Sequence, residues 1–108
     1  MSIDIGAILQ AAVGAATDAV KKVAPQAEDF LREIAKGHEG AIQSLADALA
    51  NGDIDEDTFR NEMADEGKTL EAELQAVAVM SKAIAQRAIN AFRKALVDGI
   101  TAAIKAAI

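Results

Sequence analysis

The stretch from residue 36 to residue 68 reads KGHEGAIQSLADALANGDIDEDTFRNEMADEGK, and it contains the signals that decide the predicted topology. Asn51-Gly52 predicts a helix C-terminus, because glycine readily adopts the left-handed conformation that ends many helices. Asp55 predicts the N-cap of the next helix, and two acids follow it in a first turn where the helix dipole favours negative charge. The stretch is therefore predicted to form two helices joined by a turn at residues 51–54.

The composition of the whole chain predicts the same structural class. Of 108 residues, 52% are hydrophobic, and alanine dominates, while only three residues are aromatic and one is proline. Alanine has the highest helix propensity, so this composition is typical of an all-α protein, and the length fits a single domain over residues 1–108. Alanine-rich helices bury little area per residue, which predicts that the domain gains stability by self-association.

Apolar periodicity predicts three helices, at residues 4–23, 25–50 and 55–107. Pro25 allows either the start of a new helix or a kink in a continued one, since proline is tolerated in a first helical turn. No strong stop signal interrupts the third segment before its last ten residues, so this helix is predicted to be continuous over more than forty residues. Forty helical residues span about 60 Å.

The apolar positions of these helices match in an antiparallel register, in which the numbers of opposed residues sum to 104 or 105. In this register Val13 opposes Phe92, and Leu9 opposes Leu96. The matches predict one long antiparallel hairpin that is kinked near Pro25. A compact three-helix bundle, in which the first helix folds back, is the alternative. Two helices cannot cover all of their apolar faces, so the hairpin is predicted to dimerise into a four-helix bundle.

A polar layer interrupts the apolar seam of the hairpin. His38 is the only histidine, and it falls on a core position of the second helix at the level where Glu66 falls on a core position of the third. If they are buried together, they form a charge-assisted hydrogen bond that fixes the register, and the glutamate raises the pKa of the histidine. An outward-facing histidine is the other structural possibility. The residues predicted to set how the hairpins pair are those of this layer and four apolar positions: His38, Glu66, Gly37, Gly40, Gly67, Leu9, Val13, Phe92 and Leu96.

The same layer supports a second hypothesis, a metal site. Imidazole and carboxylate groups bind iron, manganese and zinc, and ferritin-like four-helix bundles build dimetal sites from inward glutamates and Glu-x-x-His pairs. The candidate ligands are His38, Glu39, Glu62 and Glu66. The analogy is architectural, because no Glu-x-x-His motif is present in this chain. No cofactor is expected on the leading hypothesis.

Charge is divided along the chain. Residues 25–73 carry fourteen acids and four bases, whereas residues 74–108 carry five bases and one acid, within a net charge of −6. The negative total argues against binding to nucleic acid. The basic, amphipathic segment from Phe92 to Ile108 supports a third hypothesis, association with an anionic membrane surface. Its narrow polar stripe is more typical of the exposed face of a bundle helix.

Sequence motifs for catalysis are not found. The chain has no glycine-rich phosphate loop, no Gly-x-Ser-x-Gly, no His-Glu-x-x-His and no cysteine. Its N-terminus has an acid, Asp4, where a signal peptide carries bases, and no apolar run approaches the roughly 18 residues of a membrane span, so a cytoplasmic location is expected. The predicted function is that of a non-enzymatic, self-associating helical protein that acts in assembly or in binding a protein partner through apolar helix faces.

Overall fold

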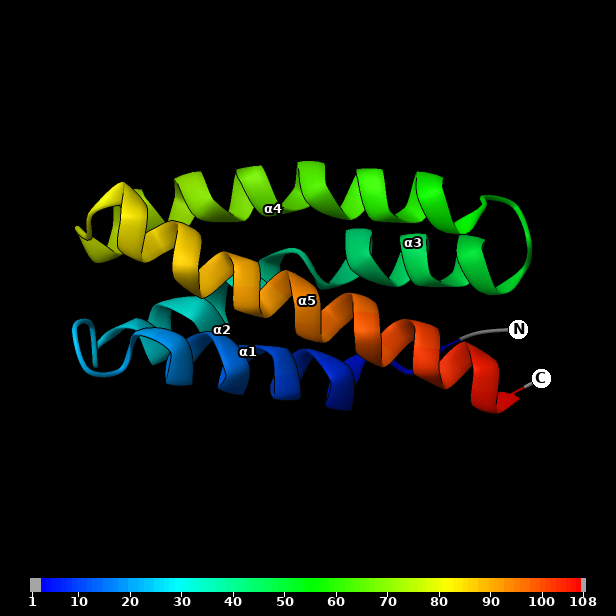
Figure 1. Cartoon of the computed structure of the whole chain (residues 1–108), viewed down its shortest axis with the longest axis horizontal. Coiled ribbons are helices and arrows are strands. Elements are labelled where there is room, and N and C mark those ends of the chain that lie inside the picture. The colour runs from blue at the N-terminus through cyan, green and yellow to red at the C-terminus, as the bar shows by residue number, and fades with distance from the viewer. Residues whose placement is uncertain (1–2, 108) are drawn as a thin grey trace.

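Helices account for most of residues 3–107, the part of the chain that the computed structural model describes. The all-α prediction is confirmed for these residues. Over this range the chain forms five helices: α1 (Gly6–Val20), α2 (Ala27–Gly37), α3 (Glu39–Ala50), α4 (Glu56–Ala78) and α5 (Lys82–Ala107). Because α3 continues the row that α2 begins, the five helices make four antiparallel rows (Figure 1). The Cα trace measures 40 × 21 × 19 Å along its principal axes.

The first helix is shorter than the predicted span of 4–23. It begins after Asp4, whose Oδ1 accepts a hydrogen bond of 3.1 Å from the backbone N–H of Gly6. It ends at Val20, whose carbonyl oxygen accepts bonds from the N–H groups of the next turn. The chain then reverses through residues 21–26, so the region around Pro25 is a full turn rather than a kink.

The predicted helix over residues 25–50 is two helices, because His38 leaves helical geometry with φ −102° and ψ 3°. The carbonyl oxygen of His38 still accepts a bond of 3.0 Å from the N–H of Ile42. The row is therefore kinked at this residue and not reversed. Gly37 and Gly40 flank the kink, and glycine weakens a helix by about 1 kcal/mol relative to alanine.

The prediction of one continuous helix over residues 55–107 is wrong, since the chain reverses at residues 79–81. Val79 adopts the left-handed conformation, with φ 50° and ψ 55°. The Oγ of Ser81 accepts a bond of 3.3 Å from the N–H of Ile84 at the start of α5. A β-branched residue disfavours the left-handed region. A reversal at a valine is therefore not expected from the sequence, and the apolar periodicity continues through these residues. Ser81, which caps the start of α5, is the one local signal for a new helix in this connection.

The turn between α3 and α4 lies at the predicted residues. Gly52 has a φ of +78°, and the Oδ1 of Asp55 accepts a bond of 2.7 Å from the N–H of Thr58. This bond stabilises the ionised carboxylate, so the pKa of Asp55 lies below its ordinary value. Local signals in the sequence were sufficient to locate this turn.

Together, the two reversals at residues 21–26 and 79–81 fold the predicted long hairpin in half. Both reversals lie at the same end of the molecule (Figure 1). The predicted antiparallel pairing is kept in both halves, because α1 packs against α5 while α2 and α3 pack against α4. One chain therefore supplies all four rows, where the extended hairpin needed two chains. The alternative prediction, a compact three-helix bundle with the first helix folded back, is closer to this arrangement, but it has three rows of helices and not four.

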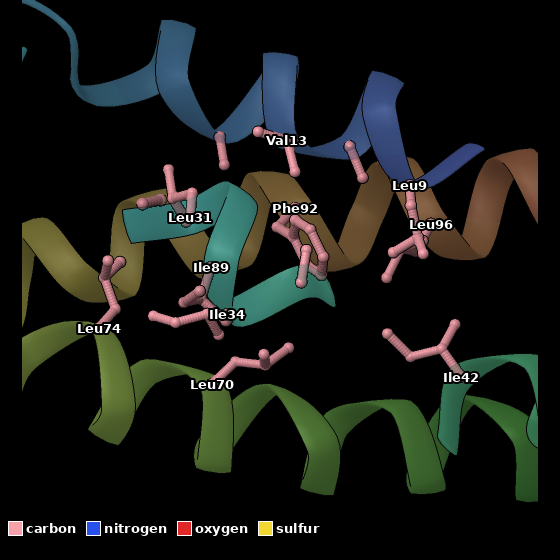
Figure 2. Close-up of a cluster of buried hydrophobic side chains, with 14 of the residues drawn as sticks. Leu9, Val13, Leu31, Ile34, Ile42, Leu70, Leu74, Ile89, Phe92 and Leu96 are labelled. Atoms are coloured by element: carbon pink, nitrogen blue, oxygen red, sulfur yellow. The ribbon is translucent and has the colours of Figure 1, made fainter. Parts of the chain in front are cut away.

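The hydrophobic core runs between these rows (Figure 2). Leu9, Val13, Phe92 and Leu96 belong to it, and each is buried within the single chain. Burying one such side chain contributes about 1.5–3 kcal/mol. The four apolar positions predicted to pair hairpins are therefore core residues that join α1 to α5.

The start of the described chain is tied to α3. The N–H of Ile3 donates to Oδ1 of Asp47 at 3.0 Å, and the side-chain amide of Gln43 donates to the carbonyl oxygen of Ile3 and to Asp47. Ile3 and Ile5 are both buried. These contacts anchor the entry to α1 at the end of the bundle opposite to residues 79–81.

Candidate functional site

His38 lies at the kink between α2 and α3 and faces α4. Its Nδ1 is 2.9 Å from Oε2 of Glu66, and its Nε2 is 3.0 Å from Oε2 of Glu73. Ionised carboxylates only accept hydrogen bonds, so both ring nitrogens can donate at once only in the doubly protonated imidazolium. When His38 is protonated, it bridges two glutamates that lie about two turns apart on one helix.

The pKa of His38 is raised above its ordinary value of 6.5. Partial burial opposes the charge and lowers the pKa, but the hydrogen bonds to Glu66 and Glu73 and the charges of these glutamates outweigh burial. The His38 and Glu66 side chains are 16% and 27% exposed, whereas that of Glu73 is 46% exposed. Solvent screens the outer pair more, so the contact with Glu66 is the stronger one.

The contact between His38 and Glu66 is the one that the antiparallel register predicts. Glu73 was not predicted, because its position lies outside the level of His38 in that register. Its spacing of seven residues from Glu66 places both on one face of α4, and this spacing is the signal that would have found it.

The ring nitrogens of His38 contact Glu66 and Glu73 and not the other two candidate metal ligands. Glu39 is exposed and lines an open groove between α1 and α2, whereas His38 lines a different groove beside α4. Glu62 is exposed on α4, and both ring nitrogens of His38 are occupied by Glu66 and Glu73. Within residues 3–107, no group of three or more His, Cys, Asp or Glu side chains is arranged to hold a metal ion.

The three glycines of the layer have different surroundings. Gly67 is buried where α4 meets α5, and a Cβ atom there would lie 3.6 Å from side-chain atoms of Ile89 and Arg93. Gly37 and Gly40 are exposed, and a Cβ atom on either would meet nothing within 4 Å. Gly67 therefore packs at ordinary van der Waals distance from side chains of α5, whereas the other two glycines border the kink.

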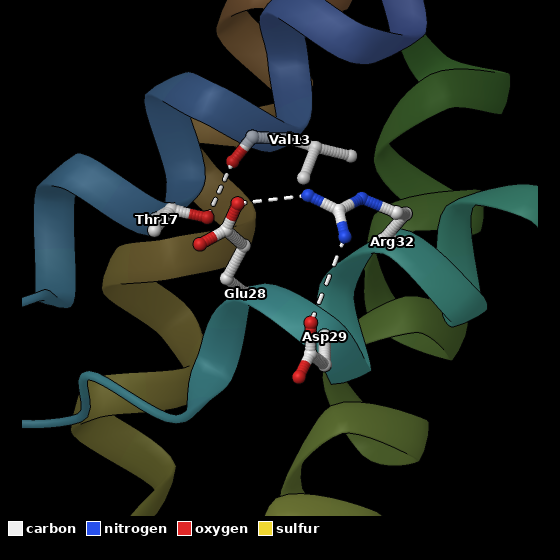
Figure 3. A network of polar contacts seen from close by, with 5 residues as sticks. All are labelled: Val13, Thr17, Glu28, Asp29 and Arg32. Atoms are coloured by element: carbon white, nitrogen blue, oxygen red, sulfur yellow. Dashed lines mark hydrogen bonds and ion pairs between the residues drawn. The ribbon is translucent and has the colours of Figure 1, made fainter.

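The groove between α1 and α2 has a volume of about 600 Å³ and carries both signs of charge. Arg32 on its wall is paired within its own helix, at 2.8 Å from Glu28 and 3.6 Å from Asp29 (Figure 3). Thr17 on the α1 side donates to the carbonyl oxygen of Val13 at 2.8 Å. The polar groups drawn in Figure 3 satisfy one another within each helix, so they define no preference for a ligand.

The basic helix α5 commits its apolar face to the core. Ile89, Phe92, Leu96 and Ile100 are buried, while the polar side of the helix is exposed and carries an ion pair of 3.0 Å between Lys94 and Asp98. Amphipathic membrane binding uses the apolar face of a helix. Among residues 3–107, none of the helices combines the length and the apolar character needed to cross a bilayer.

A second candidate site is the end of the bundle where the chain reverses twice. Among residues 3–107, the exposed large hydrophobic side chains are Val23 at 56%, Val77 at 50% and Val79 at 90%. We call residues 21–26 and 77–81 the connector end, and these two segments lie at the same end of the molecule (Figure 1). The sequence alone did not place these two segments at one end of the molecule, because that arrangement requires both reversals.

Comparison of the chain with protein-family models, with curated proteins and with solved structures finds no match. Two local features therefore carry the functional inference. One is a polar layer at His38 that joins α2 and α3 to α4. The other is an apolar connector end at which three valines are open to solvent.

Proposed function

We propose that this chain is a non-enzymatic helical assembly module that self-associates through its connector end. The observation that carries the proposal is the confinement of the exposed valines, Val23, Val77 and Val79, to that end. Burial of exposed apolar surface against another surface contributes a favourable free energy of about 25 cal/mol per Å². Large exposed apolar side chains at one end of a bundle offer such a surface to a partner.

A second copy of the chain is the occupant that we propose for this surface. A two-fold contact places the same patch on both copies, so a small apolar end can cover itself without a complementary partner. Lys21 and Lys22 are exposed beside Val23 in the connector end. Protein interfaces commonly combine apolar and polar groups in this way.

The polar layer supports a structural and not a catalytic role for His38. A general base needs an unprotonated ring nitrogen, and both nitrogens of His38 lie within hydrogen-bond distance of carboxylate oxygens, Glu66 on one side and Glu73 on the other. An imidazolium held in this way fixes the kink between α2 and α3 to α4. It thereby supports the shape of the bundle that presents the connector end.

The test is the molar mass of the purified chain, measured by sedimentation equilibrium over a wide concentration range. We expect the wild-type chain to dimerise, and the double variant Val23→Glu/Val77→Glu to remain monomeric with unchanged helical circular dichroism. The matched control, Gln10→Glu/Asn61→Glu, adds the same charge at exposed positions outside the connector end and should dimerise as wild type. A wild-type chain that is monomeric at every concentration would overturn the proposal.

The same samples test the two hypotheses of other classes. Dimerisation that requires added iron, manganese or zinc, and that is lost in His38→Ala, would replace the proposal with the metal-site hypothesis. Co-sedimentation with anionic vesicles, lost on neutralising the exposed Lys94 and Lys105, would support the membrane hypothesis instead. Our expectation is metal-independent dimerisation without vesicle binding.

A further inference from the structure

We infer that self-association proceeds by exchange of α5 between two copies, with α4 and α5 of each chain joined into one helix through residues 79–81. This inference depends on the proposed function, because it specifies how two connector ends meet. It rests on the strain at Val79, the sequence of the connector, the phase of the two helices and the topology of the bundle.

Val79 holds the connector in a conformation that its side chain opposes. Its φ of 50° lies in the left-handed region, which valine disfavours because the branched Cβ crowds the backbone. Its side chain is 90% exposed, so almost no burial offsets the strain. A straight helix through residue 79 would remove this conformation and restore backbone hydrogen bonds across the connector.

The connector sequence lacks the residues that normally reverse a helical chain. From residue 76 to residue 84 it reads AVAVMSKAI, without glycine, proline or asparagine. The other two reversals differ, because Gly52 has a positive φ in the turn before α4 and Pro25 lies in the connector before α2. Residues 79–81 are thus the reversal at which a continuous helix is compatible with the sequence.

The buried faces of α4 and α5 would be in phase on one continuous helix. Ala78 and Ala85 are seven residues apart, which is close to two helical turns, and both are buried. Leu74 on α4 and Ile89 on α5 are also buried, and their separation of fifteen residues leaves them about 60° apart around a straight helix. A joined helix would therefore carry an apolar stripe that drifts slowly around the helix across the connector.

The topology allows two copies to remake every contact of α5. In one chain α5 runs antiparallel to α4 and packs most extensively against α1. With a two-fold axis across the connector end, the straightened α5 of one copy enters the other copy antiparallel to its α4, as in the single chain. Residues 79–81 change conformation, and the exposed valines of the two ends meet around the joined helices.

Charge favours the same exchange partner. Helix α4 carries seven acids and two bases, whereas α5 carries five bases and one acid. In an exchanged dimer each basic α5 again lies against an acidic α4, so the electrostatic complementarity of the single chain is retained. In a second copy, α5 therefore meets the same acidic surface of α4 that it contacts within its own chain.

The experiment measures a distance within one chain. The chain has no cysteine, so Lys68→Cys and Lys94→Cys introduce two unique sites for spin labels at exposed positions. In the single-chain bundle they flank Gly67 and Arg93, which are neighbours across α4 and α5, where helix axes lie about 10 Å apart. On a joined helix the 26-residue separation corresponds to about 39 Å. Labelled chains are refolded with an excess of unlabelled chains, so that the distance is intramolecular.

Two variants at the hinge provide a matched comparison, because both delete the valine side chain. Val79→Ala favours the joined helix, while Val79→Gly favours the left-handed reversal and disfavours helix. If α5 is exchanged, the dimer of Val79→Ala shows the distance of about 39 Å and dissociates at a concentration at least about tenfold lower than that of Val79→Gly.

Other outcomes separate this inference from the proposed function. A dimer that keeps the short distance, and that both variants weaken equally, overturns exchange but leaves end-to-end association of closed bundles in place. A chain that stays monomeric in wild type and in Val79→Ala overturns both. The long distance in the dimer, with the short distance in the monomer, establishes exchange.

Discussion

The kink at His38 and the reversal at Val79 interrupt helices that periodicity predicts to be continuous, yet they are held in opposite ways. His38 is a largely covered side chain with a carboxylate partner for each ring nitrogen. Val79 is almost fully exposed, and its backbone is in a region that valine disfavours. The first break is stabilised by its own side chain, whereas the second is imposed by the packing of the helices that it joins.

The packing of α5 on α1 should show the largest effect. A Cβ atom at Gly99 would lie 2.8 Å from Cγ2 of Ile8, so we expect Gly99→Ala to lower the free energy of unfolding by about 2 kcal/mol. The control is Gly14→Ala on α1, where a Cβ atom meets nothing within 4 Å and better helix propensity should add about 1 kcal/mol. Urea unfolding measures both. If the two substitutions change the free energy of unfolding equally, the contact of α5 with α1 does not hold the reversal in place.

Removal of the histidine tests the first break. We expect His38→Ala to lower the free energy of unfolding by about 1–2 kcal/mol near pH 6, because the charge-assisted bonds to Glu66 and Glu73 are lost. The neighbouring Glu39→Ala changes an exposed side chain and should alter stability by less than about 0.5 kcal/mol. If both variants lose the same free energy of unfolding, the contacts of His38 with Glu66 and Glu73 do not stabilise the kink.

The pH dependence of stability should distinguish the two breaks, since His38 titrates and Val79 does not. The folded pKa of His38 is raised above 6.5, so its stabilising contribution is complete below pH 6.5 and is lost as pH rises through the folded pKa. The midpoint temperature of thermal unfolding of wild type should therefore fall toward that of His38→Gln as the pH rises from about 6 to about 9. A constant difference between the two proteins over this range would contradict the imidazolium bridge.

The smallest expected effect is at the second break. Val79→Gly relieves the left-handed strain but increases the freedom of the unfolded chain, so we expect the monomer to gain only about 0.5–1 kcal/mol. Val77→Gly is the control, because residue 77 is helical and the change should destabilise by a similar amount. If both substitutions destabilise, the conformation at residue 79 is not a source of strain in solution.

Features encoded by neighbouring residues could be predicted from the sequence. Asn51-Gly52 and Asp55 located the turn before α4, and alternating apolar steps gave the register that brings His38 to Glu66. The register held because antiparallel packing of two apolar stripes depends on spacing alone.

The reversal at residues 79–81 could not be predicted in this way. Its cause is non-local: folding back lets α1 and α5 cover the outer faces of the other two rows, and no residue between Ala78 and Lys82 encodes that gain. The same limit explains why the contact of Glu73 and the exposed valines of the connector end were missed. Each depends on which rows become neighbours and not on the signals within one helix.

The even number of rows has a topological consequence. Helix α1 begins and α5 ends at the same end of the molecule, remote from the connector end (Figure 1). A short loop joining the end of α5 to the start of α1 would close the bundle, and the chain could then be opened at residues 79–81 as a circular permutant. Such a permutant would keep all five helices in place without the left-handed valine, and its α4 and α5 could not join into one helix across residues 79–81.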